Sequence, residues 1–316
     1  MRVTTKMLTQ SLINNVNVNL QNMEEYQNQL SSGKRITKPS DDPIATAQLL
    51  STKSAIKAQE QYHRNMEDAT GWLNTTDGAL DEANEVLQRT RELAVAGATG
   101  TLPEESLGAL ADELDNLIGE MVQVANTNYA GRFIFGGGKT GTPPFEITGK
   151  DSDGNVTQVQ FISTTFDESL LDETYQQKIE IESGVTIDVS NGRTTFHTDT
   201  SGDDDINAVF EKMIELRTAL DAGDQDVVSS LIDDFDKLID NVLSERAVVG
   251  AKTKRMESAL ERSASYEIDL TTLLSKLEDV DYAEASIGFN TQQTVYESSL
   301  AVGAKIIQPS LIDFLK

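Results

Sequence analysis

The Gly-Lys-Arg stretch at residues 33–35 is the first place where the residue types could do chemistry. A glycine followed by a lysine belongs to the phosphate-binding loop Gly-x-x-x-x-Gly-Lys-Ser/Thr, which follows a strand and surrounds phosphate with backbone N–H groups. Here Asn28 stands where the first glycine is required, Arg35 replaces the Ser or Thr, and the preceding residues are expected to be helical. The stretch therefore does not predict a nucleotide site.

The chain has two histidines, His63 and His197, and neither predicts a catalytic or metal site. They are far apart in sequence and fall in different expected domains, whereas a triad or metal site needs acidic partners arranged around one of them. No Gly-x-Ser-x-Gly stretch marks a nucleophilic serine either. We expect both histidines on the surface and predict that the protein is not an enzyme.

Two acidic stretches could bind a cation. The first, DSDGNVTQVQFI at residues 151–162, begins like a calcium loop but has Val156 and Ile162 where an EF-hand needs Gly and Glu. A hairpin turn is the better interpretation. Residues 203–205, all Asp, are explained more simply as the capping of a helix N-terminus. We therefore predict neither a metal nor a cofactor.

The composition excludes several further classes of function. The 316 residues carry a formal charge of −26, and the largest cationic clusters, 34–35 and 252–255, are too small to neutralise a nucleic-acid backbone. The absence of cysteine rules out disulfides, cysteine-bound zinc and thiol nucleophiles. No apolar run is long enough for a bilayer, and residues 1–20 lack the apolar segment of a secretory signal peptide. We predict no nucleic-acid partner, no membrane contact and, for an exported protein, a route without a cleaved signal peptide.

Helical periodicity dominates the N-terminal part of the chain. Apolar residues of the first helix recur with the alternating spacing of a coiled-coil seam. They are Ile13, Val16, Leu20, Met23 and Leu30. Gly33 suits the left-handed position that ends a helix, and Asp42 before Pro43 suits the cap of the next one.

A long second helix and a third helix follow in strict heptads. The second seam is Met66, Ala69, Leu73, Thr76, Leu80, Ala83, Leu87, Thr90 and Ala94, and the third is Leu107, Leu110, Leu114, Leu117, Met121 and Val124. Gly97 and Gly100 are expected to end the second helix, and the short loop after them makes the two helices antiparallel neighbours. Inside the second helix, Gly71 and Gly78 either permit the close approach of another helix or have no structural role.

From Arg132 to about Ser201 the period changes to two, with β-branched and aromatic residues alternating with polar ones between Gly- and Asp-containing turns. Heptads then resume, with the longest seam from Leu231 to Val280. A looser stripe follows at Ile287, Thr291, Val295, Val302 and Ile306. The predicted fold class is mainly α with an inserted β domain, in which both chain ends build one long antiparallel helical bundle.

Three stretches resemble signatures of the bacterial flagellin family. LSSGKRITKPSDDP, residues 30–43, resembles the N-terminal signature, and residues 275–315 resemble the C-terminal signature. NYAGRFIFGGGKTGTPPF, residues 128–145, is similar to family members at the junction between hook and filament rather than to those that form the filament. The three occur in the order of the family and cover both ends of the chain.

The resemblance implies a structural role in the bacterial flagellum, outside the cell and without a cofactor. It implies an adaptor whose partners are flagellin, the hook-side junction protein, copies of itself in a helical ring and a flagellar export chaperone. It also implies terminal helices at 1–38 and 281–316 in an inner assembly coiled coil, a helical bundle of 39–130 with 204–280, and an outer β domain at 131–203.

Two groups of residues are the candidate sites. The candidate subunit-assembly residues are Ile13, Val16, Leu20, Met23, Leu30, Val295, Val302, Ile306, Leu311 and Phe314. The connector between the first two helices contains Gly33, Lys34, Arg35, Asp41 and Asp42. Its charges have two interpretations: a solvated loop between helix-stop and helix-start signals, or a contact between subunits that sets the angle between inner and outer layers.

Two other functions also fit the sequence. One is a filament-forming flagellin. The other belongs to a different class, a β domain that binds a carbohydrate or another adhesive ligand and is displayed on a helical stalk.

Overall fold

The computed structural model describes residues 5–100, 102–137, 140–151, 154–161, 177–190 and 208–307. The chain forms two compact units. One consists of residues 1–60 with 265–316, and the other of residues 61–264. Helices dominate both units, and the strands are short, which confirms the mainly α fold with inserted β structure.

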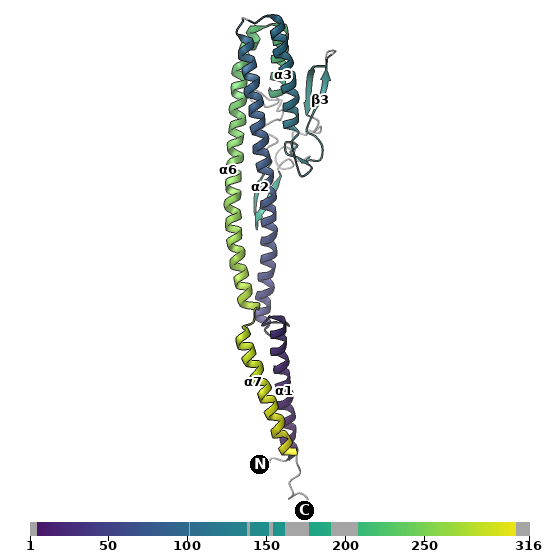
Figure 1. Ribbon diagram of the computed structural model, residues 1–316, viewed down its shortest axis with the longest axis vertical. Coiled ribbons are helices and arrows are strands. Elements are labelled where there is room, and N and C mark those ends of the chain that lie inside the picture. The colour runs from purple at the N-terminus through teal and green to yellow at the C-terminus, as the bar shows by residue number, and fades with distance from the viewer. Residues whose placement is uncertain are drawn as a thin grey trace, which may run out of the picture. The chain divides into compact units, whose positions relative to one another are not determined.

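The first unit pairs the two ends of the chain. Helix α1 (Thr5–Ser32) lies beside α7 (Tyr282–Ile307), and the two run in opposite directions (Figure 1). The unit also contains the beginning of α2 (Pro43–Ala98) and the end of α6 (Gln225–Glu278). Helix α1 ends at Gly33, which has the expected left-handed φ of 71°. A helix can end this way without strain because glycine has no Cβ.

The second unit is a bundle of α2, α3 (Glu104–Ala125), α5 (Ala208–Ala222) and α6. Every predicted seam residue of α2 from Met66 to Ala94 is buried. The two threonines on this seam satisfy their hydroxyls within the helix: Thr76 Oγ1 donates to the Trp72 carbonyl at 2.9 Å, and Thr90 Oγ1 donates to the Val86 carbonyl at 2.9 Å. The seam is thus apolar where the helices meet, with its polar groups paired.

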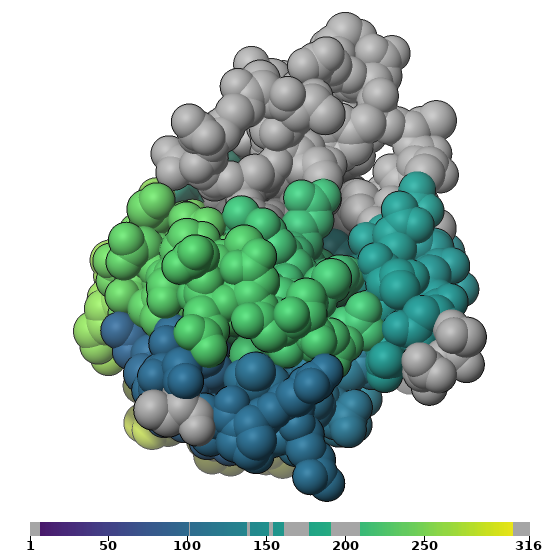
Figure 2. All heavy atoms as spheres, turned by 90° about the horizontal axis from the view of Figure 1, so that it is seen from above, coloured from purple at the N-terminus to yellow at the C-terminus, as the bar shows by residue number. Residues whose placement is uncertain are grey.

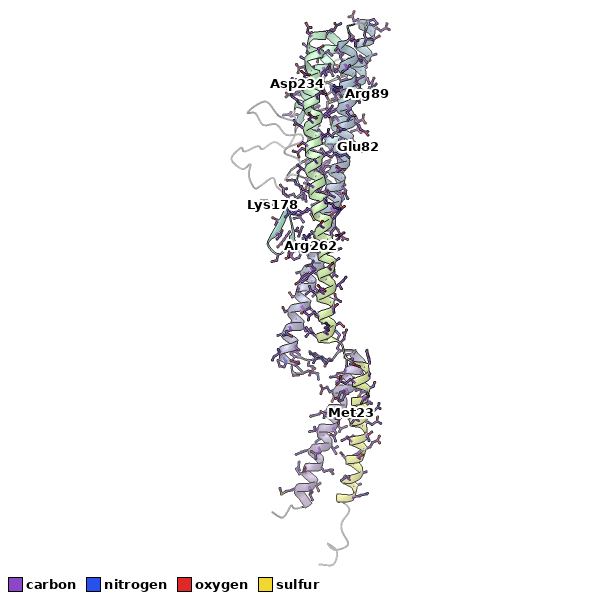
Figure 3. All side chains as sticks on the ribbon, turned by 90° about the vertical axis from the view of Figure 1, so that its left-hand side faces the viewer. Met23, Glu82, Arg89, Lys178, Asp234 and Arg262 are labelled. Carbon is purple, nitrogen blue, oxygen red and sulfur yellow. The ribbon has the colours of Figure 1, made fainter. Side chains whose placement is uncertain are left out.

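Ion pairs between helices flank this seam and agree with the antiparallel arrangement. Arg91 on α2 contacts Asp236 on α6 at 2.5 Å, while Arg246, further along α6, contacts Asp77 at 2.9 Å and also Asp81. Residues late in α2 thus contact residues early in α6, and residues earlier in α2 contact residues later in α6. Arg89, labelled in Figure 3, joins α2 to α3 through Glu113 at 2.6 Å.

The described strands form three two-stranded antiparallel sheets. Their pairs are β1 (Asn128–Tyr129) with β2 (Arg132–Phe133), β3 (Phe145–Lys150) with β4 (Val156–Phe161), and β5 (Lys178–Glu182) with β6 (Val185–Asp188). Between β3 and β4 the Asp151 amide donates to the Asn155 carbonyl at 3.0 Å, and Gly154 has a φ of 96°. The stretch that begins like a calcium loop is therefore a hairpin turn, as predicted.

The strands β3 and β4, and the turn that follows β2, contribute side chains to the same core as the helices. Phe135, Phe145 and Val156 are 1%, 2% and 3% exposed and belong to the apolar cluster of the bundle. The Asn126 side chain pairs with the backbone of Phe145 through both its amide nitrogen and its oxygen, at 2.8 and 3.0 Å. Figure 2 shows the β3–β4 hairpin, in teal, beside the green surface formed by α5 and the residues that follow it. The region around these strands is anchored to the helices.

A buried arginine also ties the β3–β4 hairpin to the bundle. Arg217 of α5 has a side chain only 7% exposed, and its Nη1 lies 3.4 Å from Asp151 and 3.9 Å from Asp115 of α3. Asp115 in turn accepts the Val156 amide at 2.7 Å. The guanidinium therefore pairs with the carboxylate of Asp151, the first residue of the stretch that begins like a calcium loop.

Three glycines of α2 behave differently from one another. A Cβ at Gly71 would overlap the hydroxyl of Tyr129, so this glycine permits a close approach, although of a side chain from β1 rather than of a helix. A Cβ at Gly78 would meet nothing within 4 Å. Gly97 was expected to end the helix but lies inside it, because α2 continues to Ala98 and Gly100, with a φ of 67°, takes the left-handed position.

Candidate subunit-assembly surface and connector

The contact between α1 and α7 is built on small residues of α7. A Cβ at Gly288 would lie 2.7 Å from the ring of Tyr26, and a Cβ at Gly303 would lie 2.5 Å from Leu12. Between these two points Asn19 donates a hydrogen bond to the Ser299 hydroxyl at 3.3 Å. Two α1 side chains thus occupy the space that glycine leaves, and a polar pair lies between them.

Half of the seam of α1 is therefore shifted by one residue from the one that aliphatic spacing predicts. Leu12, Asn19 and Tyr26 are the positions, a heptad apart, that contact α7. Val16, Met23 and Leu30 are partly buried, as a seam would require, and Met23 is labelled on α1 in Figure 3.

The remaining predicted seam residues of α1 do not lie on this contact. Ile13 is 47% exposed and Leu20 is 37% exposed. The glycines of α7 explain the difference, because they leave room for Tyr26 and Leu12 at positions where a Cβ would lie 2.7 Å and 2.5 Å from those side chains.

The aliphatic stripe of α7 is also exposed. Val295 is 41% exposed, Val302 is 53% exposed and Ile287 is 68% exposed. These positions alternate with Gly288, Ser299 and Gly303, which lie against α1. We call the exposed residues of both helices the outer aliphatic face. Its members are Ile13, Leu20, Ile287, Val295 and Val302.

Three of the predicted assembly residues have no described side chain. Ile306 lies near the end of α7, while Leu311 and Phe314 lie outside the described residues. His197 and residues 203–205 lie outside them too. Within the described parts of the chain, no group of three acidic or histidine residues could hold a metal ion. In the same parts, no helix is both long enough and apolar enough to cross a bilayer.

The connector brings Lys34 to a buried carboxylate. Glu278, the last residue of α6, has a side chain only 8% exposed. The Lys34 ammonium lies 2.5 Å from its Oε1, and the ammonium of Lys53 on α2 lies 2.8 Å from its Oε2. Each carboxylate oxygen therefore has a lysine, and all three residues belong to the first unit.

Backbone hydrogen bonds join the connector to the break between α6 and α7. The Arg35 amide donates to the Glu278 carbonyl at 2.7 Å, and the Val280 amide donates to the Gly33 carbonyl at 3.1 Å. These bonds surround an antiparallel bridge between Lys34 and Asp279. The Arg35 guanidinium adds a hydrogen bond to the Leu277 carbonyl at 3.1 Å.

The two connector aspartates cap local structure. One Asp41 oxygen accepts the amides of Lys38 and Thr37 at 2.8 and 3.1 Å. These bonds, the one from Lys38 foremost, lower the pKa of Asp41. Asp42 accepts the Ala45 amide at 2.9 Å, which is the predicted cap of α2.

The lysines set the protonation of Glu278. Burial works to raise the pKa of Glu278, but the hydrogen bonds from Lys34 and Lys53 outweigh it and hold that pKa below the ordinary value of 4.5. The hydrogen bond to Glu278 in turn raises the pKa of Lys34 above 10.5. The carboxylate and the Lys34 ammonium are both charged at neutral pH.

Sequence reasoning missed Glu278 and Lys53. The chain has 52 acidic residues, and no spacing rule distinguishes the one at the end of α6. The available signal was a carboxylate at a helix C-terminus, where the helix dipole disfavours it and a cation must compensate.

Comparison with known proteins agrees with the arrangement of the two chain ends. Residues 3–140 match the model of the bacterial flagellin N-terminal helical region, and residues 232–315 match that of the bacterial flagellin C-terminal helical region. Together the matches span most of the chain. The chain belongs to the bacterial flagellin family. The pairing of α1 with α7 thus joins the two regions by which this family is recognised.

Relatives within the flagellin family include both hook-associated proteins and flagellins. Flagellar hook-associated protein 3 of Escherichia coli K12 is 26% identical over 309 residues, which cover 95% of each chain. A flagellin of Halalkalibacterium halodurans is 25% identical over 294 residues, covering 93% of this chain and 91% of its own. Among solved structures, flagellar hook associated protein-3 from Legionella pneumophila has a TM-score of 0.57 at 15% identity, covering 72% of this chain and 98% of that one. The last similarity supports the fold.

Proposed function

We propose that this flagellin-family chain is the structural adaptor of the bacterial flagellum that joins the hook-side junction protein to the flagellin filament through helical packing. The observation that carries the proposal is the outer aliphatic face. Its residues lie on the two helices that pair the chain ends, and they are exposed in the single subunit. A row of exposed aliphatic side chains on helices marks a surface that another protein covers.

The similarity to a hook-associated protein supports a role at the junction, and the nearly equal similarity to a flagellin keeps the filament as the second candidate. The match to the hook-associated relative covers nearly the whole of this chain and nearly the whole of the relative. The described side chains also form ion pairs between helices, caps at helix ends and an apolar bundle core. This combination is what a building block of an assembly requires.

Burial of the outer aliphatic face supplies the driving force for assembly. A large aliphatic side chain that becomes fully buried contributes roughly 1.5–3 kcal/mol. Ile13, Leu20, Val295 and Val302 are already about half covered, so each contributes a fraction of that amount. Several such residues on each subunit, repeated around a ring, favour assembly and oppose the repulsion between subunits that each carry a charge of −26.

The proposal includes the arrangement of the parts. Residues 1–38 and 281–316 form the inner assembly coiled coil, 39–130 with 204–280 form the bundle around it, and 131–203 lie outermost. The partners are copies of the same chain in a helical ring, flagellin, the hook-side junction protein and an export chaperone. The chain leaves the cell without a cleaved signal peptide and works in the flagellum.

The experiment replaces four outer aliphatic residues together: Ile13→Gln, Leu20→Gln, Val295→Thr and Val302→Thr. The matched control changes two exposed polar residues of the same helices, Glu24→Gln and Ser298→Ala. Immunogold labelling on cells should place the unaltered and control proteins between hook and filament. The fourfold variant should be secreted but not retained there, and filaments should be absent. Normal filaments on cells that secrete the fourfold variant would contradict the proposal.

A filament-forming flagellin is the second candidate, because a flagellin also covers nearly the whole chain. Self-assembly separates the two functions. A flagellin should polymerise alone into long filaments after seeding, whereas the adaptor should form at most short rings. Electron microscopy of the purified chain decides between them, and label along the whole filament on cells would favour the flagellin.

A further inference from the structure

Glu278 is an unusual carboxylate in a strongly acidic chain. It is nine-tenths buried, it ends a helix of 54 residues, and each of its oxygens faces a lysine. A carboxylate at this end of a helix is opposed by the helix dipole, and burial opposes its charge as well. Both costs have to be offset locally, and the two lysines are the groups placed to do so.

The lysines reach Glu278 from two separate segments. Lys34 lies in the connector that follows α1, and Lys53 lies on the first turns of α2. Glu278 itself immediately precedes the break between α6 and α7. One carboxylate therefore holds together the two places where the chain enters and leaves the α1–α7 pair.

The geometry points to a latch: we propose that Glu278, clamped by Lys34 and Lys53, positions the α1–α7 pair by holding its two connectors together, and that acid releases it. The latch goes beyond the adaptor role and is independent of it. It adds a third interpretation of the connector charges to the two that the sequence left open, since Lys34 has a partner inside its own subunit.

The hydrogen bonds of the latch form one unit. The side-chain clamp lies beside two backbone hydrogen bonds, from Arg35 to Glu278 and from Val280 to Gly33. Both bonds cross between the connectors, so they can persist only while the connectors stay together. Removal of the carboxylate charge leaves the ammonium groups unpaired and should open the backbone bonds too.

Other charged groups near Glu278 cannot replace the clamp. The Arg35 guanidinium is directed to the Leu277 carbonyl. Asp279 accepts the Ser275 hydroxyl at 2.6 Å and, being acidic, adds to the negative charge. Lys34 and Lys53 are therefore the cations in contact with the buried carboxylate.

The direction of the pH effect follows from the two groups. Because the pKa of Glu278 lies below 4.5 in the folded chain, the clamp contributes fully above 4.5 and is lost as the pH falls through that lowered value. Because the pKa of Lys34 lies above 10.5, the contribution of Lys34 is complete below 10.5 and is lost only at higher pH. The latch is closed at neutral pH and opens in acid.

Amide hydrogen exchange of Arg35 and Val280 in the full chain tests the latch. Selective ¹⁵N labelling of arginine and valine allows both amides to be followed by NMR, with rates divided by their intrinsic values at each pH. In the unaltered chain at pH 7 both amides should be protected. In Glu278→Gln the protection of both should fall by at least about tenfold, as expected for loss of a charged hydrogen bond. The protection of amides in residues 61–264 should not change, which shows that the variant is folded.

A titration distinguishes positioning by charge from a purely structural role of the side chain. In the unaltered chain, protection of Arg35 and Val280 should drop in one step below pH 4.5. In Glu278→Gln it should be low throughout and show no step. Lys34→Met and Lys53→Met should each weaken protection, whereas Lys57→Met, an exposed lysine one turn beyond Lys53, should not.

Three outcomes overturn the proposal: unprotected amides in the unaltered chain at pH 7, equal protection in Glu278→Gln, or an acid step that persists in that variant. None of these results would bear on the adaptor role, which depends on the outer aliphatic face. Conversely, the fourfold aliphatic variant should lose capture at the hook tip, while the amide exchange of Arg35 and Val280 should stay the same as in the unaltered chain.

Discussion

The bundle of residues 61–264 and the α1–α7 pair use the same heptad spacing in opposite ways. In the bundle, the aliphatic residues of α2 turn inward, and Leu73, Leu80 and Leu87 have no exposed surface. In the terminal pair, glycine, serine and asparagine lie at the contact, while aliphatic residues such as Val302 remain outside. The bundle buries its aliphatic seam within one subunit, whereas the terminal pair leaves aliphatic side chains exposed, and these are the residues that the proposed assembly would cover.

The largest predicted effect compares a core leucine with an outer valine. Leu80→Ala removes a fully buried side chain and should destabilise the bundle by about 3–5 kcal/mol. Val302→Ala removes a half-exposed one and should change the stability of the isolated subunit by less than about 0.5 kcal/mol. Urea unfolding followed by circular dichroism measures both. A similar loss for the two variants would mean that the terminal pair is as complete as the bundle.

A medium effect is expected at the glycines of α7. Gly303→Ala places a methyl group 2.5 Å from Leu12 and should weaken the pairing of α1 with α7 by about 1–3 kcal/mol. Gly250→Ala, on α6, meets nothing within 4 Å and serves as the control, since alanine favours a helix over glycine. Limited proteolysis should cut α1 faster in Gly303→Ala only. Equal cleavage of the two variants would show that Leu12 does not depend on this glycine.

A second glycine comparison, with effects of similar size, uses two glycines a heptad apart inside α2. Gly71→Ala would overlap the Tyr129 hydroxyl and should lower the free energy of unfolding by about 1–3 kcal/mol. Gly78→Ala meets open space and should raise it by up to about 1 kcal/mol. The sign of the shift in melting temperature decides this prediction. Two shifts of the same sign would show that contact with Tyr129 does not matter.

The sequence predicted the bundle well because the aliphatic residues that make the heptad pattern are the same residues that the helices bury against one another. The aliphatic heptads of α2 are buried one by one, from Met66 to Ala94. The turn at Asp151 and the caps at Gly33 and Asp42 were also predicted, since each depends on residues close in the chain.

The terminal pair was predicted less well for a physical reason. Aliphatic spacing locates the apolar positions, and here several of them, such as Ile13 and Val302, are exposed. The actual contact depends on Gly288 and Gly303, whose role is the space that they leave for Tyr26 and Leu12. The partner of Lys34 was equally hidden, because Glu278 lies more than 200 residues away and belongs to no motif.

The burial of Val302 on assembly is the central claim, and a single thiol tests it most directly. The chain contains no cysteine, so Val302→Cys introduces a unique reactive group at a position that is 53% exposed in the free subunit. Its rate of reaction with a maleimide is measured on the purified subunit and on isolated flagella that carry the variant. The account predicts rapid labelling of the subunit and labelling slower by at least about a hundredfold in flagella, because full burial excludes the reagent and the water around the thiolate. Equal rates in the two states would contradict the claim that other subunits cover the outer aliphatic face.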